Sequence, residues 1–462
     1  MKKIILSLTV IGILFSCGKT KKEESLSKIE IEEEVKEKFI PVHDTVIENA
    51  VIYEANIRQY SEEGTFNAFT KDIPVLKDLG VKVLWIMPIY PISTTKSKGS
   101  LGSYYAVSDY TKVNPEFGTI EDFRVLVKTA HDNGIYVILD WVANHTGWDH
   151  VWLKEHPEYY TKDKEGNITH TVDTDWTDVA DLNYDNQQMR EQMIQDMSYW
   201  IKEEGVDGFR CDVAGMVPVD FWENAVAELE KIKPVFMLAE GWEPELLENA
   251  FDMGYGWDTH HKMNDIAKGK ANVAEWDKRM EQIDSMYAKD DILMNFTSNH
   301  DENSWNGTVK ERMGDAKEVL AALSYLAPGM PLIYSGQEYD MDKRLLFFDK
   351  DTISKEKGVF FPLYKKLGKL KNTNQALHGG KNAASYKRIK TSDDTKILAF
   401  AREKENNKVV FIANLTKEKV NFILDDTKEE AYIDYFSEKR IHLKTGKGLE
   451  LNPWKYLILI KE

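Results

Sequence analysis

The chain has 462 residues, of which 77 are acidic and 60 are lysine or arginine, so its formal net charge is −17. This charge argues against nucleic acid as a partner, because phosphate binding needs a basic face. With only two cysteines, a disulfide framework is excluded, and the length suffices for one large domain plus a small one.

The N-terminus has the features of an export signal. Two lysines precede the apolar run Ile4 to Phe15, which is shorter than the roughly 20 residues that span a bilayer as a helix. The run ends at Leu14-Phe15-Ser16-Cys17, which resembles the lipobox of bacterial lipoproteins. We therefore predict a lipoprotein signal peptide over residues 1–16 and lipidation of Cys17, with an ordinary signal peptide as the alternative. The protein would then be exported and membrane-anchored in a bacterial cell envelope.

The rest of the chain divides by pattern into three parts. Residues 17–48 are rich in lysine and glutamate, which predicts a solvated tether. Over residues 49–375, short apolar runs alternate with amphipathic stretches, as in a parallel sheet with crossover helices. Residues 376–462 show alternating strands and turns, which predicts a C-terminal antiparallel β-sandwich packed on the first domain.

Eight strands and intervening helices are predicted in the large domain. Two helices are expected over Ile120–Asn133 and Gln188–Glu204, each followed by a glycine that can end a helix. Eight strand-helix units predict an α/β fold, a (β/α)8 TIM barrel, with the active site at the C-terminal ends of its strands. The predicted strands are Val51–Ile57, Lys82–Pro88, Ile135–Val142, Asp207–Asp212, Val235–Glu240, Met253–Trp257, Ile292–Thr297 and Pro331–Ser335.

Four of these strands end in charged or histidine side chains. Residues 140–145 end the third, Arg210 and Asp212 the fourth, Glu240 the fifth, and residues 299–301 follow the seventh. Arg210 and Asp212 share one face of their strand, because side chains alternate with period two. A guanidinium beside a carboxylate favours its ionised form, which a nucleophile needs. A structural ion pair is the alternative for this pair alone, but four such strand ends together favour a catalytic site.

These four regions, in this order, resemble the signature of the α-amylase family, family 13 of the glycoside hydrolases. Residues 103–110, 113–119 and 181–183 add to the resemblance, which extends from about Val51 to the C-terminus. The ordered set is specific, whereas any single region would be a weak signal. The resemblance also implies a short loop subdomain inserted after strand 3, at about residues 144–181.

The resemblance assigns catalytic roles to three carboxylates. Breaking a glycosidic bond needs two carboxyl groups across it, one to donate a proton and one to act as nucleophile or base. By analogy, Asp212 is the nucleophile, Glu240 is the acid and base, and Asp301 binds sugar hydroxyls. Arg210 would orient Asp212.

Further residues would bind substrate or metal. Tyr105, His145 and His300, together with Arg210, match substrate-binding positions of the family, and a purely structural role is the alternative for the tyrosine and the histidines. No cofactor is expected for the chemistry itself. Asn144 and Asp181 match positions that often ligate a structural Ca²⁺, which prefers oxygen donors. Met216 stands where the family often adds a histidine, and this departure weakens the calcium prediction.

The sequence therefore predicts a retaining α-glycoside hydrolase that cleaves α-1,4-linked glucans or maltooligosaccharides through a covalent glycosyl-enzyme. The partner would be an oligo- or polysaccharide α-glucan, cut internally. One alternative is an α-glucosidase or glucosyl-transferring enzyme of the same family, acting on α-1,6 linkages, sucrose or trehalose. Another is a non-catalytic glycan-binding protein on the same fold, which the presence of all three carboxylates disfavours. The motif Val179-Ala180-Asp181-Leu182-Asn183 fits no single specificity subgroup, so linkage preference stays open.

Overall fold

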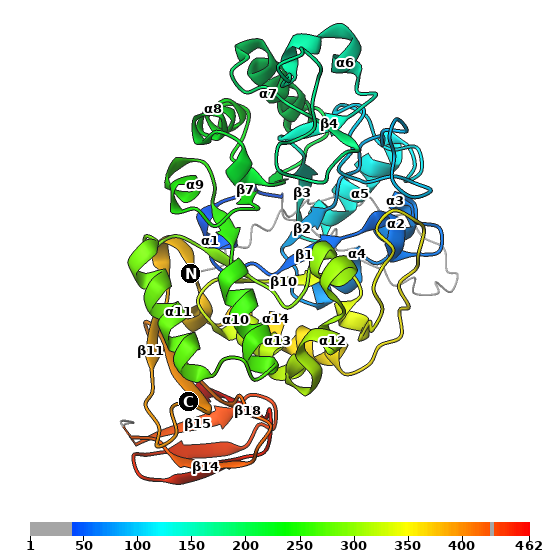
Figure 1. Cartoon of the computed structure of the whole chain (residues 1–462). Helices are drawn as coiled ribbons and strands as arrows, with labels where there is room; N and C mark the ends of the chain where they lie inside the picture. Colours follow the sequence, from blue (N-terminus) through cyan, green and yellow to red (C-terminus); the bar gives the residue numbers. More distant parts are fainter. Residues whose placement is uncertain (1–38, 426–428) are drawn as a thin grey trace, which may run out of the picture. The chain divides into compact units, whose positions relative to one another are not determined.

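A computed structural model describes residues 39–425 and 429–462 of the chain (Figure 1). The predicted signal peptide, Cys17 and the predicted tether as far as residue 38 lie outside the described residues. None of the helices in the described ranges is long and apolar enough to cross a membrane.

Eight parallel strands close into a barrel, which confirms the predicted (β/α)8 architecture (Figure 1). Each strand pairs with the next barrel strand along the chain, and the last pairs with the first. The strands are β1 (Ile52–Ala55), β2 (Val83–Ile86), β3 (Tyr136–Trp141), β6 (Gly208–Cys211), β7 (Phe236–Ala239), β8 (Met253–Tyr255), β9 (Leu293–Asn295) and β10 (Met330–Tyr334).

The connecting helices begin and end at the signals that the sequence carries. Helix α5 (Ile120–Asp132) starts at a capping box between Thr119 and Asp122, and Gly134 follows it with a φ of +74°. Further helices of the barrel domain are α2 (Ile57–Tyr60), α3 (Phe66–Thr70), α4 (Ile73–Asp78), α7 (Gln187–Lys202), α8 (Val219–Glu230), α9 (Pro244–Asn249), α10 (Trp257–Ala267), α11 (Val273–Met286), α12 (Val309–Met313), α13 (Lys317–Leu326) and α14 (Phe360–Thr373).

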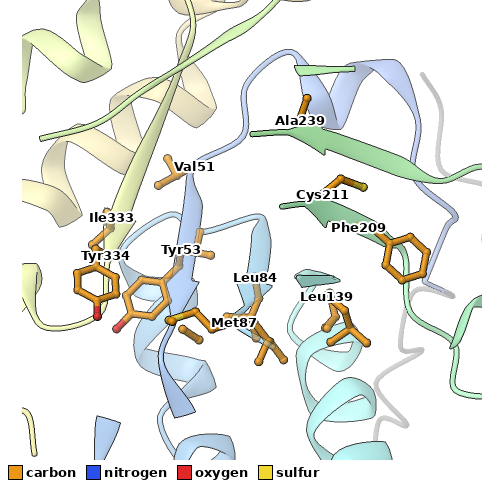
Figure 2. Packing of buried hydrophobic residues seen from close by; sticks show 14 of the residues in the cluster. Val51, Tyr53, Leu84, Met87, Leu139, Phe209, Cys211, Ala239, Ile333 and Tyr334 are labelled. Carbon is orange, nitrogen blue, oxygen red and sulfur yellow. The ribbon is translucent and has the colours of Figure 1, made fainter. Parts of the chain in front are cut away.

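The two faces of each barrel strand carry different side chains. The outward face joins the apolar layer under the helices, and Figure 2 shows part of this layer, including Phe209 and Cys211 of β6 and Ala239 of β7. Cys211 is fully buried there as a free thiol, pointing away from Arg210 as the period-two pattern predicts. At Gly208, an added Cβ would lie 1.9 Å from the Phe236 carbonyl oxygen, so only glycine lets β6 and β7 approach this closely.

A short N-terminal segment packs against the inner barrel residues. Helix α1 (Asp44–Ile47) and the residues before it bury Val42, Val46 and Ile47 in one cluster with inward-facing strand residues. The Phe39 ring also stacks on His131 at 4.0 Å. The tether predicted to run to residue 48 is therefore wrong from residue 39 onward, because these apolar side chains gain more from burial than from solvation.

The segment between β3 and α7 carries structure of its own in the region predicted as a loop subdomain. Strands β4 (His145–Gly147) and β5 (Val179–Asp181) pair antiparallel, with His145 opposite Asp181. Helix α6 (Val151–Glu155) lies between them in the chain. The small sheet is built on the residues that leave β3, so it is positioned directly beside the strand ends.

The C-terminal domain contains antiparallel sheets, as predicted. A six-stranded sheet has the order β11-β12-β13-β18-β15-β16, and β14 pairs with β17. Along β12, Leu398 and Phe400 join the core of the barrel domain, whereas Ile397, Ala399 and Ala401 join the core shared with β14 and β17. The strands are β11 (Ser385–Arg388), β12 (Ile397–Lys404), β13 (Asn407–Asn414), β14 (Val420–Ile423), β15 (Glu430–Asp434), β16 (Arg440–Leu443), β17 (Gly448–Leu451) and β18 (Tyr456–Lys461).

Candidate active site

Polar side chains gather where the barrel strands end. Asp140 of β3 and Arg210 of β6 occupy positions that pair across neighbouring strands. Asp212 and Glu240 follow directly after β6 and β7, and Asp301 lies in the turn after β9. Closure of a parallel barrel brings all strand C-termini to one end, so the four predicted regions meet there.

The Arg210 guanidinium is the centre of this cluster. It is fully buried, and its Nη1 atom donates hydrogen bonds to Asp140 Oδ1 at 2.8 Å and to Asp212 Oδ1 at 3.0 Å. Its Nη2 atom lies 2.8 Å from Glu240 Oε2, and its Nε donates to the Tyr255 hydroxyl at 3.2 Å. Arg210 therefore fixes three carboxyl groups at once, since a planar fork of donors can hold several acceptors in one geometry.

Besides its ion pair with Arg210, Glu240 receives a hydrogen bond from an unusual backbone turn. Val213 has a φ of +38° and a ψ of +47°, a left-handed conformation that is costly for a β-branched residue. In this turn the Val213 N–H donates to Glu240 Oε2 at 2.9 Å. Both Arg210 and Val213 thus contact the Oε2 atom of Glu240. Its Oε1 atom is left available to carry a proton.

The protonation of the cluster follows from its burial. Burial raises the pKa of Asp212 well above the usual range of an aspartate, although the Arg210 guanidinium opposes the shift. Burial likewise raises the pKa values of Asp140 and Asp301. Closely spaced carboxyl groups cannot all ionise at once, so the cluster retains protons and titrates as a unit. Such a group can supply one proton donor and one ionised nucleophile at the same pH.

Tyr105 and His300 complete one wall of the site. The Tyr105 hydroxyl donates to Asp140 Oδ2 at 3.0 Å and lies 2.8 Å from His300 Nε2, while the two rings stack at 5.4 Å. Its neighbour Tyr104 instead bonds Asn56 and lies under Arg58, so the structure shows which tyrosine faces the cluster.

His145 lies at the edge of this group. It is buried on β4, and burial lowers the pKa of its ring to about 4. Its ring hydrogen-bonds the backbone of Tyr105 and the Asn144 amide. Its predicted contact with sugar stays a prediction, and the observed contacts show that it supports the segment that carries Tyr105.

Three participants were missed by the sequence analysis as site residues. Glu54 of β1 accepts a hydrogen bond from His300, Asp140 accepts from Arg210, and Tyr255 of β8 contacts Arg210. Each is the inward-facing residue near the C-terminal end of a barrel strand. That position is the signal that could have found them, because every second residue of such a strand points into the barrel.

The two predicted metal ligands are joined by a third side chain. The Asn144 amide donates to the Thr171 hydroxyl at 2.9 Å, and that hydroxyl donates to Asp181 Oδ1 at 3.0 Å. Within residues 39–425 and 429–462, no group of three or more histidine, cysteine or acidic residues is arranged to hold a metal ion. Thr171 therefore bridges the two predicted ligands, and the Ca²⁺ site itself stays a prediction.

Comparison with known proteins agrees with this geometry. Residues 48–238 match the model of the α-amylase catalytic domain, and residues 387–458 match the maltogenic amylase C-terminal domain. The chain is 31% identical to a noncanonic maltogenic α-amylase, AmyB, from Thermotoga neapolitana, covering 89% of this chain and 98% of that one, with a TM-score of 0.82.

Two other relatives are known by sequence. α-Amylase 3 of Dictyoglomus thermophilum is 27% identical, over 89% of this chain and 93% of the relative. A 4-α-glucanotransferase of Thermotoga neapolitana is 31% identical, over 60% of this chain and 68% of the relative. With both domains matched, the chain belongs to the α-amylase family of glycoside hydrolases.

Proposed function

We propose that the protein is a retaining hydrolase that cleaves internal α-1,4 bonds of starch-like glucans or maltooligosaccharides. The observation that carries the proposal is the single Arg210 guanidinium that contacts both Asp212 and Glu240. One guanidinium reaches both carboxyl groups only if they lie close together. Retaining glycosidases keep these groups about 5–5.5 Å apart, whereas inverting enzymes separate them by about 6.5–9.5 Å.

The contacts suggest how the two carboxyl groups divide the work. Arg210 holds Asp212 by Oδ1, so Oδ2 is free to attack the anomeric carbon. As that bond forms, the glycosidic oxygen leaves and takes the proton from Glu240 Oε1. In the second step, the hydrolysis of the glycosyl-enzyme, Glu240 removes a proton from water. The water oxygen bonds to the anomeric carbon and displaces Asp212 from the sugar. Asp301, whose side chain is 36% exposed, would bind sugar hydroxyls.

Exposed aromatic rings support a chain-like substrate. Trp242 and Trp305 are 49% and 51% exposed, although large aromatic residues are usually buried. Trp242 follows Glu240 by two residues, and Trp305 follows Asp301 by four. Flat rings that follow two different barrel strands suit the apolar faces of successive sugar units.

A glucan-transferring enzyme is the second candidate. The relative named a 4-α-glucanotransferase is as similar in identity as the maltogenic α-amylase, at 31%. Both activities start from the same glycosyl-enzyme and differ only in whether water or a sugar hydroxyl attacks it. Action on α-1,6 linkages, sucrose or trehalose remains part of this alternative.

The test is the product profile on soluble starch and maltooligosaccharides. We expect early maltooligosaccharides, a rapid fall in viscosity, and products that appear first as the α-anomer in proton NMR. Release of glucose alone would contradict internal cleavage. Longer transfer products without new reducing ends would establish the transferase, and a β-anomer formed first would contradict a nucleophilic Asp212. Absence of turnover on these glucans, with turnover on pullulan, isomaltose, sucrose or trehalose, would reassign the substrate.

We also propose that the protein is anchored to a membrane through lipid on Cys17, on the basis of the lipobox-like sequence alone. One acyl chain anchors only marginally, so the mature protein should carry more than one and partition with membranes. Mass spectrometry of the mature N-terminus measures this directly. An unmodified Cys17, or a soluble mature form that begins elsewhere, would contradict the anchor.

A structural calcium ion between Asn144 and Asp181 stays a prediction from the family resemblance. Thr171 bonds Asn144 Nδ2 and Asp181 Oδ1, so an ion would use the oxygens Asn144 Oδ1 and Asp181 Oδ2. The reaction steps above use no ion.

A further inference from the structure

A buried carboxylate lies beneath the active-site histidine. Glu54 is fully buried on β1, and its Oε1 atom is 2.6 Å from His300 Nδ1 and 3.3 Å from the His300 backbone nitrogen. Its other oxygen, Oε2, has no hydrogen-bond partner among the described residues. Burying a carboxylate with one unpaired oxygen raises the free energy of the folded state. An apolar residue at this inward position would give a more stable protein. The contact with His300 therefore explains why a carboxylate occupies this buried position.

The groups on the far side of His300 are also acceptors. The Tyr105 hydroxyl has one proton, and it donates that proton to Asp140 Oδ2 at 3.0 Å. Its oxygen, 2.8 Å from His300 Nε2, is then left to accept. Asp301 Oδ2 lies 3.3 Å from the same nitrogen. When Asp140 and Glu54 are ionised, acceptors face both Nδ1 and Nε2, and a ring with a proton on each nitrogen, the imidazolium form, satisfies both contacts.

We propose that Glu54 is a positioning residue that keeps His300 doubly protonated, so that Nε2 is a permanent hydrogen-bond donor facing Asp301 and a sugar hydroxyl. A neutral ring with its proton held on Nδ1 by Glu54 would have a bare Nε2, and it could not donate there. The role rests on the proposed function, because it concerns the same sugar-binding wall. Glu54 acts through His300 and itself touches neither substrate nor the reacting atoms.

The surrounding charges support this state. Burial by itself disfavours the charged ring, yet the carboxylates of Asp301 and Glu54 raise the pKa of His300 to about 9, against the opposing charge of Arg210. Asp140 faces the same group through Tyr105. The remaining neighbours, the rings of Trp85 and Phe347, are uncharged. The imidazolium thus adds a second positive charge to a cluster of five carboxyl groups, Glu54, Asp140, Asp212, Glu240 and Asp301, whose other cation is Arg210.

The direct test is a pH titration of histidine ring nitrogens by NMR in ¹⁵N-histidine-labelled protein. The His300 signals are assigned by their loss in His300→Gln, among the 11 histidines of the chain. In the wild type we expect both His300 nitrogens to stay protonated through pH 8. Glu54→Gln keeps the shape and an acceptor oxygen but removes the charge, so the ring should become neutral at least about one pH unit lower. A neutral His300 at pH 7 in the wild type would overturn the proposal, even if the variant fails to fold.

The kinetic test is the pH dependence of kcat/KM on whichever glucan the wild type hydrolyses. The alkaline midpoint should move down by about one unit or more in Glu54→Gln, with about a 10²-fold loss of kcat/KM above that midpoint. In Glu54→Asp the alkaline midpoint should lie closer to the wild-type value, because the negative charge is restored. An alkaline limb identical to that of the wild type would overturn the proposal.

A matched control separates the shift of the alkaline limb from the general destabilisation that follows the loss of any buried carboxylate. Glu338 is an equally buried carboxyl that contacts the Tyr53 hydroxyl at 2.6 Å. Glu338→Gln should lower stability without moving the alkaline limb, and a shift as large as that of Glu54→Gln would count against a specific role. If the wild type hydrolyses none of the glucans, the proposed function fails, and the NMR titration still decides the protonation of His300.

Discussion

Asp212→Asn is expected to abolish hydrolysis, with a loss on the order of 10⁴-fold or more in kcat, because an amide oxygen is a poor nucleophile. Glu240→Gln should lose about 10²–10⁴-fold, the range that general acid-base catalysis supplies. Steady-state rates of purified variants on the same glucan measure both. Each variant is nearly the same shape as the wild type, so a loss of this size reflects chemistry and not packing.

The leaving group distinguishes the two roles. An α-glucosyl fluoride releases fluoride without needing a proton, so Glu240→Gln should form the glycosyl-enzyme from it readily, whereas Asp212→Asn should not. Asp220→Asn is the matched control, because Asp220 lies exposed on α8, paired with Arg190. Near-wild-type turnover in either active-site variant, or equal losses in the Asp220 control, would refute the assignment.

Arg210→Met is expected to cost both activity and stability. Removing a buried cation leaves Asp140, Asp212 and Glu240 without their shared partner, and breaking a buried pair costs about 3–5 kcal/mol in the free energy of unfolding. The pKa of Asp212, already raised by burial, should rise further once the guanidinium is gone. The nucleophile would then be protonated at neutral pH, and the acidic limb of activity should move to higher pH.

The sign of the pH effect on stability follows from the same shift. Carboxyl groups whose pKa is higher in the folded state than in the unfolded state bind more protons when folded, so stability falls as pH rises above about 4. The stability deficit of Arg210→Met should therefore be larger at pH 8 than at pH 5, as measured by urea unfolding. Arg210→Lys keeps the charge but cannot bridge three carboxyl groups, so it should restore part of the stability and little of the activity.

Arg402→Met provides the matched comparison for Arg210→Met. Arg402 is just as buried, but it donates to the backbone carbonyl oxygens of Ser385, Leu326, His378 and Ala384. Its loss should also destabilise the protein, because buried acceptors lose their donor, but the acidic limb of activity should stay in place, because the partners of Arg402 are these backbone carbonyls and not the site carboxyl groups. A pH-independent deficit in Arg210→Met would contradict the shared-cation explanation.

The sequence alone was enough to predict the barrel and the residues at its catalytic end. Apolar runs that alternate with amphipathic stretches require a parallel sheet with helices, and the closed barrel follows from eight such units. Because all strand C-termini of a parallel barrel meet, the sequence pattern alone predicts that Arg210, Asp212, Glu240 and Asp301 lie together. The sequence does not show where the tether ends, because the scattered apolar residues between Phe39 and Ile47 have no helical or strand periodicity.

Other features depend on the tertiary structure. The choice between Tyr104 and Tyr105, the left-handed turn at Val213, and the sharing of Arg210 among three carboxyl groups are set by backbone direction and strand register. Glu54 and His300 lie 246 positions apart in the chain. A period-two pattern shows that Glu54 points inward, but only closure of the barrel with its particular stagger determines which side chain it meets. The local sequence pattern therefore determines which residues reach the site. The packing of distant strands determines which of these side chains contact one another and which of them carry protons.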